Sequence, residues 1–265
     1  MGTFCFAGSP DAKKSDVLRV CEAETTRQWR DLVMIPSESM CHPAAAALLG
    51  GELGNIYAEG LPQPLLCHDP RPSASDAARF NAWRSRLGDR RFYKGTVNAD
   101  RVELIGQRRV AEAFARLPGS PPAEDIFVNL QPLSGAAANL SVFVALLKPG
   151  DRIMGLDLSH GGHLTHGSRF NFSGKTYEAR SYGADLKTRR LDYDAIERQA
   201  REVMPRLIIG GASAYPWDFD WPRMRSIADS VGARLMADVA HLAGADVARH
   251  AGRGVPAGVR LRPPL

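Results

Sequence analysis

The chain has 265 residues, of which 44% are hydrophobic and 24% are charged, values typical of a folded globular protein. Its net charge of +5 comes from arginines spread along the sequence, and no basic run is interleaved with aromatic residues, which argues against nucleic-acid binding. We expect no membrane-spanning segment, no secretory leader and no paired-cysteine site. These features predict a cytoplasmic protein whose mild positive charge suits an anionic small ligand.

The first residues of the chain predict helices. Residues 13–31 mix apolar and charged side chains, and we expect an exposed helix or arm within residues 1–33. A short helix is expected over 44–49, with Ser37 or Ser39 as its N-cap.

A segment rich in proline and polar residues then interrupts the pattern. We expect residues from about 64 to 90 to form a surface insertion. Helical spacing returns over 102–117. The side chains expected on one side of this helix are Val102, Ile105, Val110, Ala113 and Phe114.

Beyond Pro122, predicted strands and helices alternate. The strands are expected over 126–130, 153–156, 207–210 and 234–237, and the helices over 134–147, 192–202 and 223–231. This alternation predicts an α/β domain with a largely parallel sheet flanked by helices, within residues 34–247. Residues 248–265 have no core-forming pattern and are expected to be a disordered tail.

Residues 158–167, with the sequence LSHGGHLTHG, follow a predicted strand directly. Three glycines among three histidines predict a sharply turning loop that presents imidazoles at the end of the strand. His160, His163 and His166 have a spacing that metal ligands can have, but the glycines disfavour a regular helix and no nearby Cys or Glu completes a tetrahedral set. We therefore predict no metal, which leaves stacking on a flat heteroaromatic ligand or purely structural roles.

Two further groups follow predicted strands. Ser134, Gly135 and Ala136 open an apolar helix, where backbone N–H groups can bind a phosphate; a capped helix without a ligand is the alternative. Asp238 and His241 follow the strand over 234–237, and a buried carboxylate there needs a partner, such as a ring nitrogen, a ribose hydroxyl, Mg²⁺ or the first turn of a helix. Together, an anion site, an imidazole and an aspartate match the three demands of pyridoxal phosphate.

Seven segments, in this order, resemble the serine hydroxymethyltransferase (glycine hydroxymethyltransferase) family. They are NIYAEG at 55–60, VNLQPLSGAAAN at 128–139, LLKPGD at 146–151, DLSHGGHLTHGS at 157–168, NFSGK at 171–175, GASAY at 211–215 and DVAHLAG at 238–244. The resemblance implies the large domain of a fold type I pyridoxal-phosphate enzyme that interconverts serine and glycine. It also implies tetrahydrofolate as the one-carbon carrier and a homodimer whose active sites are shared between subunits.

The resemblance assigns to the cofactor Ser134, Gly135, Ala136, His163, Ser213, Asp238 and His241. It implies that Ser134 and Gly135 hold the phosphate and that His163, also a catalytic residue, stacks on the pyridine ring. Asp238 would pair with the ring N–H and keep the ring protonated, so that the ring draws electrons from the substrate. Ser213 and His241 would lie near its phenolic oxygen.

The resemblance assigns four residues to the substrate. Ser37 matches the serine that binds the substrate carboxylate, and Tyr57 and Glu59 match residues that reach into the site of the partner subunit. Glu59 would be the acid/base of the hydroxymethyl transfer, and Tyr93 the catalytic tyrosine.

Two departures from the family pattern affect the substrate side. Most family members lack the segment at about 64–90, and Phe92 replaces the first tyrosine of the family's pair. A sister activity, threonine transaldolase or aldolase, therefore stays an alternative.

A third departure concerns the Schiff-base lysine. The family's run ending in His-Lys does not occur after residue 244, and Lys187 is the last lysine of the sequence. We expect a C-terminally truncated chain, a fragment or the product of a frameshift near residues 245–253, with negligible turnover of its own. A catalytically dead paralogue that acts as a binding subunit is the other alternative.

Overall fold

The computed structural model describes residues 16–35, 38, 40–62, 76–79, 90–117, 119–244 and 247. The chain divides into two compact units, Met1–Met40 and Cys41–Leu265. The first unit contains α1 (Asp16–Arg30), all of whose residues are exposed, which confirms the predicted exposed helix. The expected tail at 248–265 and most of the expected insertion at 64–90 lie outside the described residues.

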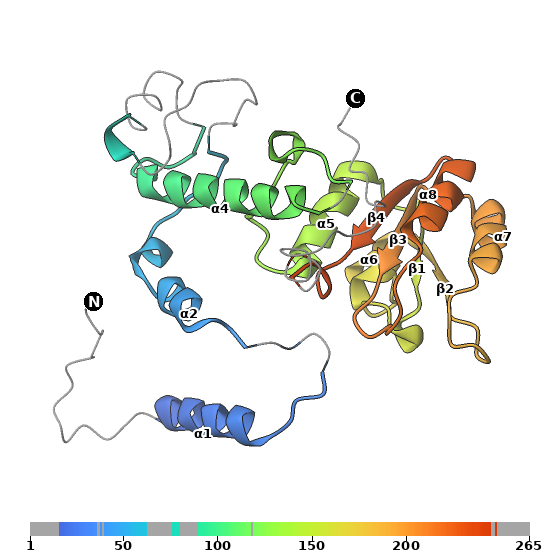
Figure 1. Cartoon of the computed structure of the whole chain (residues 1–265), viewed down its shortest axis with the longest axis horizontal. Coiled ribbons are helices and arrows are strands. Elements are labelled where there is room, and N and C mark those ends of the chain that lie inside the picture. The colour runs from blue at the N-terminus through green and yellow to red at the C-terminus, as the bar shows by residue number, and fades with distance from the viewer. Residues whose placement is uncertain are drawn as a thin grey trace. The chain divides into compact units, whose positions relative to one another are not determined.

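A four-stranded sheet in the second unit confirms the predicted α/β class (Figure 1). Its strands are β1 (Arg152–Leu156), β2 (Glu178–Tyr182), β3 (Leu207–Gly211) and β4 (Arg234–Asp238), in the order β2-β1-β3-β4. All three pairings are parallel, so the four carboxyl ends meet at one edge of the sheet. That edge is where α/β sheets bind ligands.

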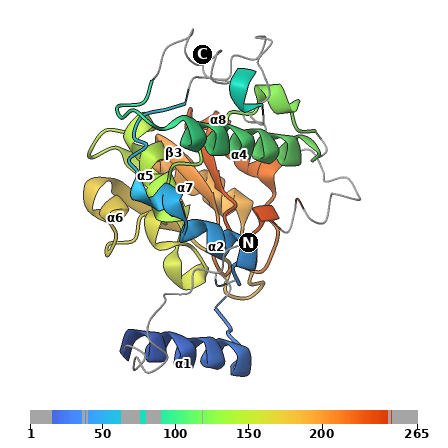
Figure 2. The ribbon, with the colours of Figure 1, turned by 90° about the vertical axis from the view of Figure 1, so that its left-hand side faces the viewer.

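Helices pack on both faces of the sheet. They are α7 (Tyr193–Val203) and α8 (Trp221–Ser230) on one face, and α5 (Gly135–Leu146) and α6 (Phe172–Thr176) on the other. Figure 2 shows the strands behind α5. On β3, Ile208 packs in the first layer and Ile209 in the second, and both are fully buried because successive side chains of a strand point to opposite faces.

The second unit also contains α2 (Pro43–Leu49), η1 (Glu52–Asn55) and α4 (Val97–Ala115). The N-cap of α2 is His42, whose ring accepts the N–H of Ala44, so the predicted cap by Ser37 or Ser39 is wrong. In α4 the buried side contains Leu104 and Ala111, while Val102 is exposed and was assigned to the wrong side. None of the helices in the described part of the chain is long and apolar enough to cross a membrane.

One strand was predicted wrongly and one was missed. Residues 126–130 have no regular secondary structure and pair with no strand among the described residues, and the side chain of Phe127 is exposed. A short turn, η2 (Ala123–Asp125), precedes them. β2 lies at an edge of the sheet, where Glu178 and Arg180 stay in solvent, so it has no apolar run.

Candidate active site

A cavity of about 260 Å³ opens at the carboxyl ends of β1, β3 and β4. It is lined by Ser134, Gly135, Ala136, His163, Ala212, Ser213, Asp238, Ala240 and His241. The structure thus brings together the seven residues that the family resemblance assigns to a cofactor. They come from four separate segments of the chain, which are the start of α5, the loops after β1 and β3, and the end of β4 with the residues that follow it.

The N-terminus of α5 forms one wall of the cavity. Ser134 is its N-cap, and the Ser134 hydroxyl oxygen accepts the N–H of Ala137 at 3.2 Å. The first N–H groups of a helix have no acceptor within the helix, and the helix dipole makes this end positive. Gly135 and Ala136, which line the cavity, therefore offer backbone donors that suit a phosphate.

The loop of residues 158–167, the histidine loop, forms a second wall of the cavity and packs tightly against β1. It contains two short turns, η3 (Leu158–His160) and η4 (Leu164–His166). A Cβ at Gly162 would lie 2.0 Å from the carbonyl oxygen of Leu156, and a Cβ at Gly155 would lie 2.7 Å from that of His166. The loop can follow the strand this closely only because both positions are glycine.

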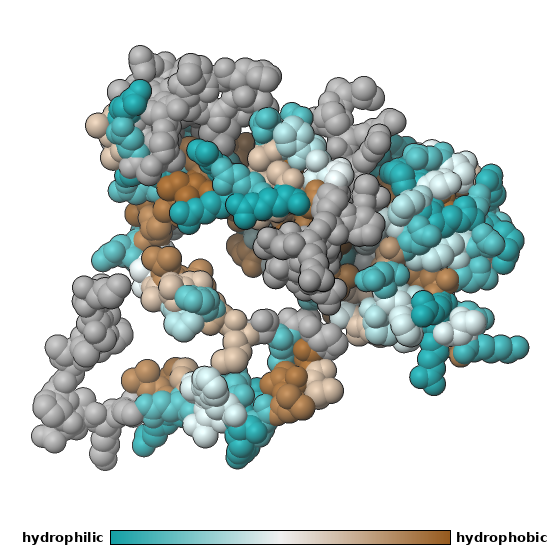
Figure 3. Space-filling view, in the orientation of Figure 1, coloured by the Kyte–Doolittle hydropathy of each residue, from teal (hydrophilic) through white to brown (hydrophobic). Residues whose placement is uncertain are grey.

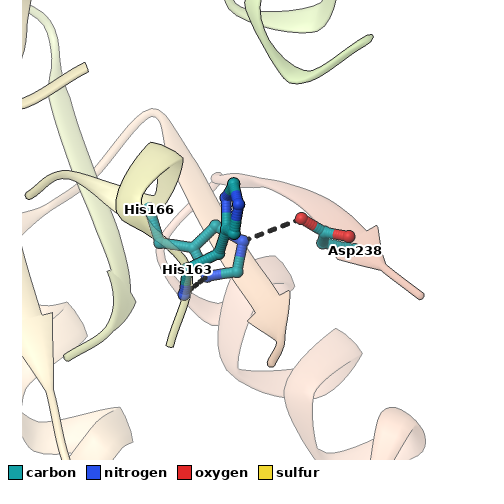
Figure 4. Close-up of side chains that lie close together, drawn as sticks. All are labelled: His163, His166 and Asp238. Carbon is teal, nitrogen blue, oxygen red and sulfur yellow. Dashed lines mark hydrogen bonds and ion pairs between the residues drawn. The ribbon is translucent and has the colours of Figure 1, made fainter. Parts of the chain in front are cut away.

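Asp238, at the end of β4, is an ionised carboxylate held by three donors, of which Figure 4 shows His166. Its Oδ2 accepts from His166 Nε2 and from the amide of Asn139, both at 2.9 Å, and its Oδ1 accepts the N–H of Ala240 at 3.2 Å. Burial alone would raise the pKa of Asp238, but these hydrogen bonds lower it well below its usual range. The side chain is therefore negatively charged at neutral pH.

His163 is held as a neutral imidazole. Its Nδ1 lies 2.7 Å from the hydroxyl oxygen of Thr165 and accepts the N–H of the same residue at 3.2 Å. Burial, and then the neighbouring His166, lower the pKa of His163. The cavity thus has an uncharged ring beside a charged carboxylate.

His163, His166 and Asp238 also form a possible metal-binding group, with ligand atoms within 4.8 Å of one another. The hydrogen bonds argue against a metal. The Nδ1 atoms of His163 and His166 accept the backbone N–H groups of Thr165 and His163, at 3.2 Å and 3.3 Å. Each neutral ring then carries its proton on Nε2 and has no lone pair to offer there.

Tyr57, Glu59 and Tyr93 form a second group, outside the lining of the cavity. The rings of Tyr57 and Tyr93 are 5.2 Å apart, and the carbonyl oxygen of Glu59 accepts the N–H of Phe92 at 3.1 Å. All three side chains are exposed, Tyr57 at 72%. The backbone of Glu59 is paired with that of Phe92, but all three side chains face solvent.

Arg91 fastens this second group to α4. Its side chain, only 1% exposed, forms ion pairs with Asp100 at 2.7 Å and Glu103 at 2.6 Å. It also donates to the carbonyl oxygens of Ala58 and Gly60. Sequence reasoning missed Arg91, although acidic residues nine and twelve positions later were a possible signal.

A comparison with family models decides the family. The model described as serine hydroxymethyltransferase matches residues 80–257, more than half of the chain. The chain belongs to the serine hydroxymethyltransferase family. It is also similar to the serine hydroxymethyltransferase of Synechococcus sp. (strain JA-3-3Ab), with 42% identity over 240 residues. That match covers 91% of this chain and 47% of the relative, so the chain spans about half the length of the curated relative.

The structure also shows three polar residues to which the sequence, even with its resemblance to the serine hydroxymethyltransferase family, had assigned no role. Asn139, Thr165 and His166 hold Asp238 and His163 in place. A polar Asn139 within an apolar helix was the available signal. Ser37, the predicted carboxylate-binding residue, lies outside the described residues.

Proposed function

We propose that this chain serves the interconversion of serine and glycine, with tetrahydrofolate as the one-carbon carrier, and that pyridoxal phosphate binds in the cavity at the strand ends. The observation that carries this proposal is the cavity itself. It combines a helix N-terminus, the neutral ring of His163 and the ionised carboxylate of Asp238. An anion, a flat ring and a protonated nitrogen are the three features that such a site selects.

The donors and acceptors of the cavity fit pyridoxal phosphate part by part. Ser134, Gly135 and Ala136 would hold the phosphate through the Ser134 hydroxyl and the first-turn N–H groups. Ser213 and His241 are the polar side chains that would lie near the phenolic oxygen. When bound, the cofactor supplies an electron-withdrawing ring.

The chain's own residues control charge and orientation. The carboxylate of Asp238 accepts hydrogen bonds from Asn139 and His166. Its low pKa lets it keep a proton on a ring nitrogen that it faces. A neutral His163 can stack on a positively charged ring without charge repulsion, which a protonated imidazole could not do. His166 and Asn139 prevent the carboxylate from turning away.

The substrate side of the proposal rests on the second group. Glu59 would act as the acid/base and Tyr93 as the catalytic tyrosine, with Tyr57 and Ser37 binding the substrate. Because the described members of this group are exposed, we propose that they complete the site of a second copy in a cytoplasmic homodimer.

Exposed apolar side chains support this dimer. They occur on α2 and η1 and just after them, and they are Leu48, Leu49, Leu53 and Ile56. Figure 3 shows α2 largely in tan and brown. Apolar groups gathered next to functional side chains favour an interface.

The test is binding of pyridoxal phosphate to the purified 265-residue chain, measured by equilibrium dialysis. Asp238→Asn removes the charge that pairs with the ring nitrogen and should weaken binding by about 10- to 100-fold. Asp229→Asn is the matched control, because Asp229 is an exposed partner of Arg225 on α8. Undetectable binding by the wild type, or equal affinity for Asp238→Asn, would contradict the proposed site.

The reaction is tested by a separate assay. Because Lys187 is the last lysine of the sequence, we expect negligible cleavage of serine by the chain alone. Together with an intact family member that supplies this lysine, cleavage that depends on tetrahydrofolate is expected, and it should fall in Glu59→Gln. Release of acetaldehyde from threonine without folate would assign the chain to an aldolase instead.

A further inference from the structure

Thr165 and Asn139 connect the two side chains that the proposed function places against the cofactor ring. The amide nitrogen of Asn139 lies 2.8 Å from the hydroxyl oxygen of Thr165 and 2.9 Å from Oδ2 of Asp238. Both Asn139 and Thr165 are buried, at 8% and 1% exposed. The two hydrogens of one amide are therefore divided between the carboxylate and the hydroxyl.

The direction of each hydrogen bond follows from the chemistry of the groups. An amide nitrogen only donates, so the hydroxyl oxygen of Thr165 accepts from Asn139. The hydroxyl proton of Thr165 is then available to Nδ1 of His163, at 2.7 Å, which also accepts the backbone N–H of Thr165. Two donors on Nδ1 exclude a proton there, so the neutral ring carries its proton on Nε2.

We propose that Thr165 and Asn139 are positioning residues that fix His163 in its Nε2–H tautomer and couple the orientation of its ring to Asp238. The tautomer is a property of the chain alone. Only the benefit to a bound pyridoxal-phosphate ring rests on the proposed function.

The surroundings of His163 explain why a dedicated relay is useful. Among the described residues, the titratable groups that face its ring are His166, Asp238 and His241. Asp238 favours a positive charge on His163, whereas the two histidines and burial oppose it. The Thr165 hydroxyl donates to Nδ1 of His163, which accepts only while that nitrogen has no proton. It therefore stabilises the neutral ring and opposes the effect of Asp238 on the charge of His163.

The experiment is long-range proton–nitrogen NMR on the chain with ¹⁵N-labelled histidine, across a pH series and without cofactor. The wild type should show a protonated Nε2 and an unprotonated Nδ1 on His163. Thr165→Val keeps the side-chain volume but removes the hydroxyl donor. It should raise the pKa of His163 by about half to one pH unit, the equivalent of one hydrogen bond.

Further variants separate positioning from a general structural role. Thr165→Ser should restore the wild-type tautomer, and Asn139→Ala should give a smaller change than Thr165→Val because the hydroxyl remains. Ser141→Ala is the matched control, since its hydroxyl donates to the carbonyl of Ala137 within the same helix as Asn139. It should leave the His163 signals unchanged. If Thr165→Val does not fold, the Asn139→Ala and Thr165→Ser pair gives the same comparison.

Binding of pyridoxal phosphate is measured on the same samples, and Thr165→Val should weaken it about fivefold. A proton on Nδ1 in the wild type, or unchanged His163 signals in both Thr165→Val and Asn139→Ala, would overturn the relay. A wild type with the expected tautomer but no affinity for the cofactor would instead contradict the proposed function and leave the relay standing.

Discussion

The cavity and the segment Ala58–Gly60, which Arg91 anchors, differ in how their side chains are positioned. In the cavity, the functional groups of Asp238 and His163 are each held by hydrogen bonds from their own chain. In the segment, Arg91 holds the backbone at Ala58 and Gly60, while the side chain of Glu59 lies between them and faces solvent. The cavity side chains are held in place by their own chain, whereas the segment has an anchored backbone and presents its reactive groups to solvent.

This difference indicates where ligand contacts are made. Hydrogen-bonded side chains lose little entropy on binding, so the cavity can recognise a cofactor within one chain. A fixed backbone with free side chains suits contacts that form only when a second surface arrives. The comparison therefore predicts that substitutions in the two regions change different measured quantities.

The largest expected effect is on Arg91. Arg91→Met removes the cation that pairs with both Asp100 and Glu103, whose side chains are 4% and 13% exposed. Breaking such a pair costs about 3–5 kcal/mol of unfolding free energy. Urea unfolding followed by circular dichroism measures this loss.

The control for Arg91 is Arg108→Met, because Arg108 pairs with Glu112 on the exposed side of the same helix. Its cost should stay below about 1 kcal/mol. Equal destabilisation by the two substitutions would show that the buried ion pairs do not anchor the segment.

An intermediate effect is expected in the pH dependence of stability. Because the pKa of Asp238 is lowered in the folded state, the unfolded state binds more protons in acid, and stability is lost as the pH falls below about 5. Asp238→Asn should remove part of this loss, so its urea midpoint should fall less between pH 5 and pH 3. Asp229→Asn should keep the wild-type slope; a wild-type slope in Asp238→Asn would mean that this carboxylate does not drive acid destabilisation.

The smallest effect on stability is expected at Glu59. Its side chain is exposed, so Glu59→Gln should change the unfolding free energy by less than about 0.5 kcal/mol. The affinity for pyridoxal phosphate should also stay unchanged, because Glu59 does not line the cavity. Isothermal titration measures the affinity, and thermal unfolding measures the stability. A weaker cofactor affinity in Glu59→Gln would contradict the separation between the cavity and the segment that contains Glu59.

The sequence predicted the central strands because they have strong local patterns, whereas the cavity residues were assigned through the resemblance to the family. β1 and β3 were predicted from apolar runs, which buried parallel strands need, and β4, at the other edge of the sheet, was predicted from its shorter apolar run. β2 was missed because Glu178, Arg180 and Ser181 are polar and exposed, so the strand has no apolar run. The run at 126–130 was misjudged because a strand also needs a neighbour, which no local pattern reveals.

The supporting residues of the site were harder to predict for a different reason. The hydrogen bond between Asn139 and Asp238 joins positions 99 residues apart, so the sequence around one residue does not predict its contact with the other. The same holds for Arg91 and the carbonyl oxygens of Ala58 and Gly60, because these residues precede Arg91 by more than 30 positions in the sequence. Motifs indicate what touches a ligand, whereas the groups that hold those motifs in place emerge only from the folded chain.

Gly155 limits how this protein can change over evolution. Since the backbone of His166 rests against β1 at this glycine, any larger residue there would displace the loop from the strand. Variation in sheet and loop is thus interdependent, and a mutational library that diversifies the loop alone should return more functional clones than one that also randomises position 155.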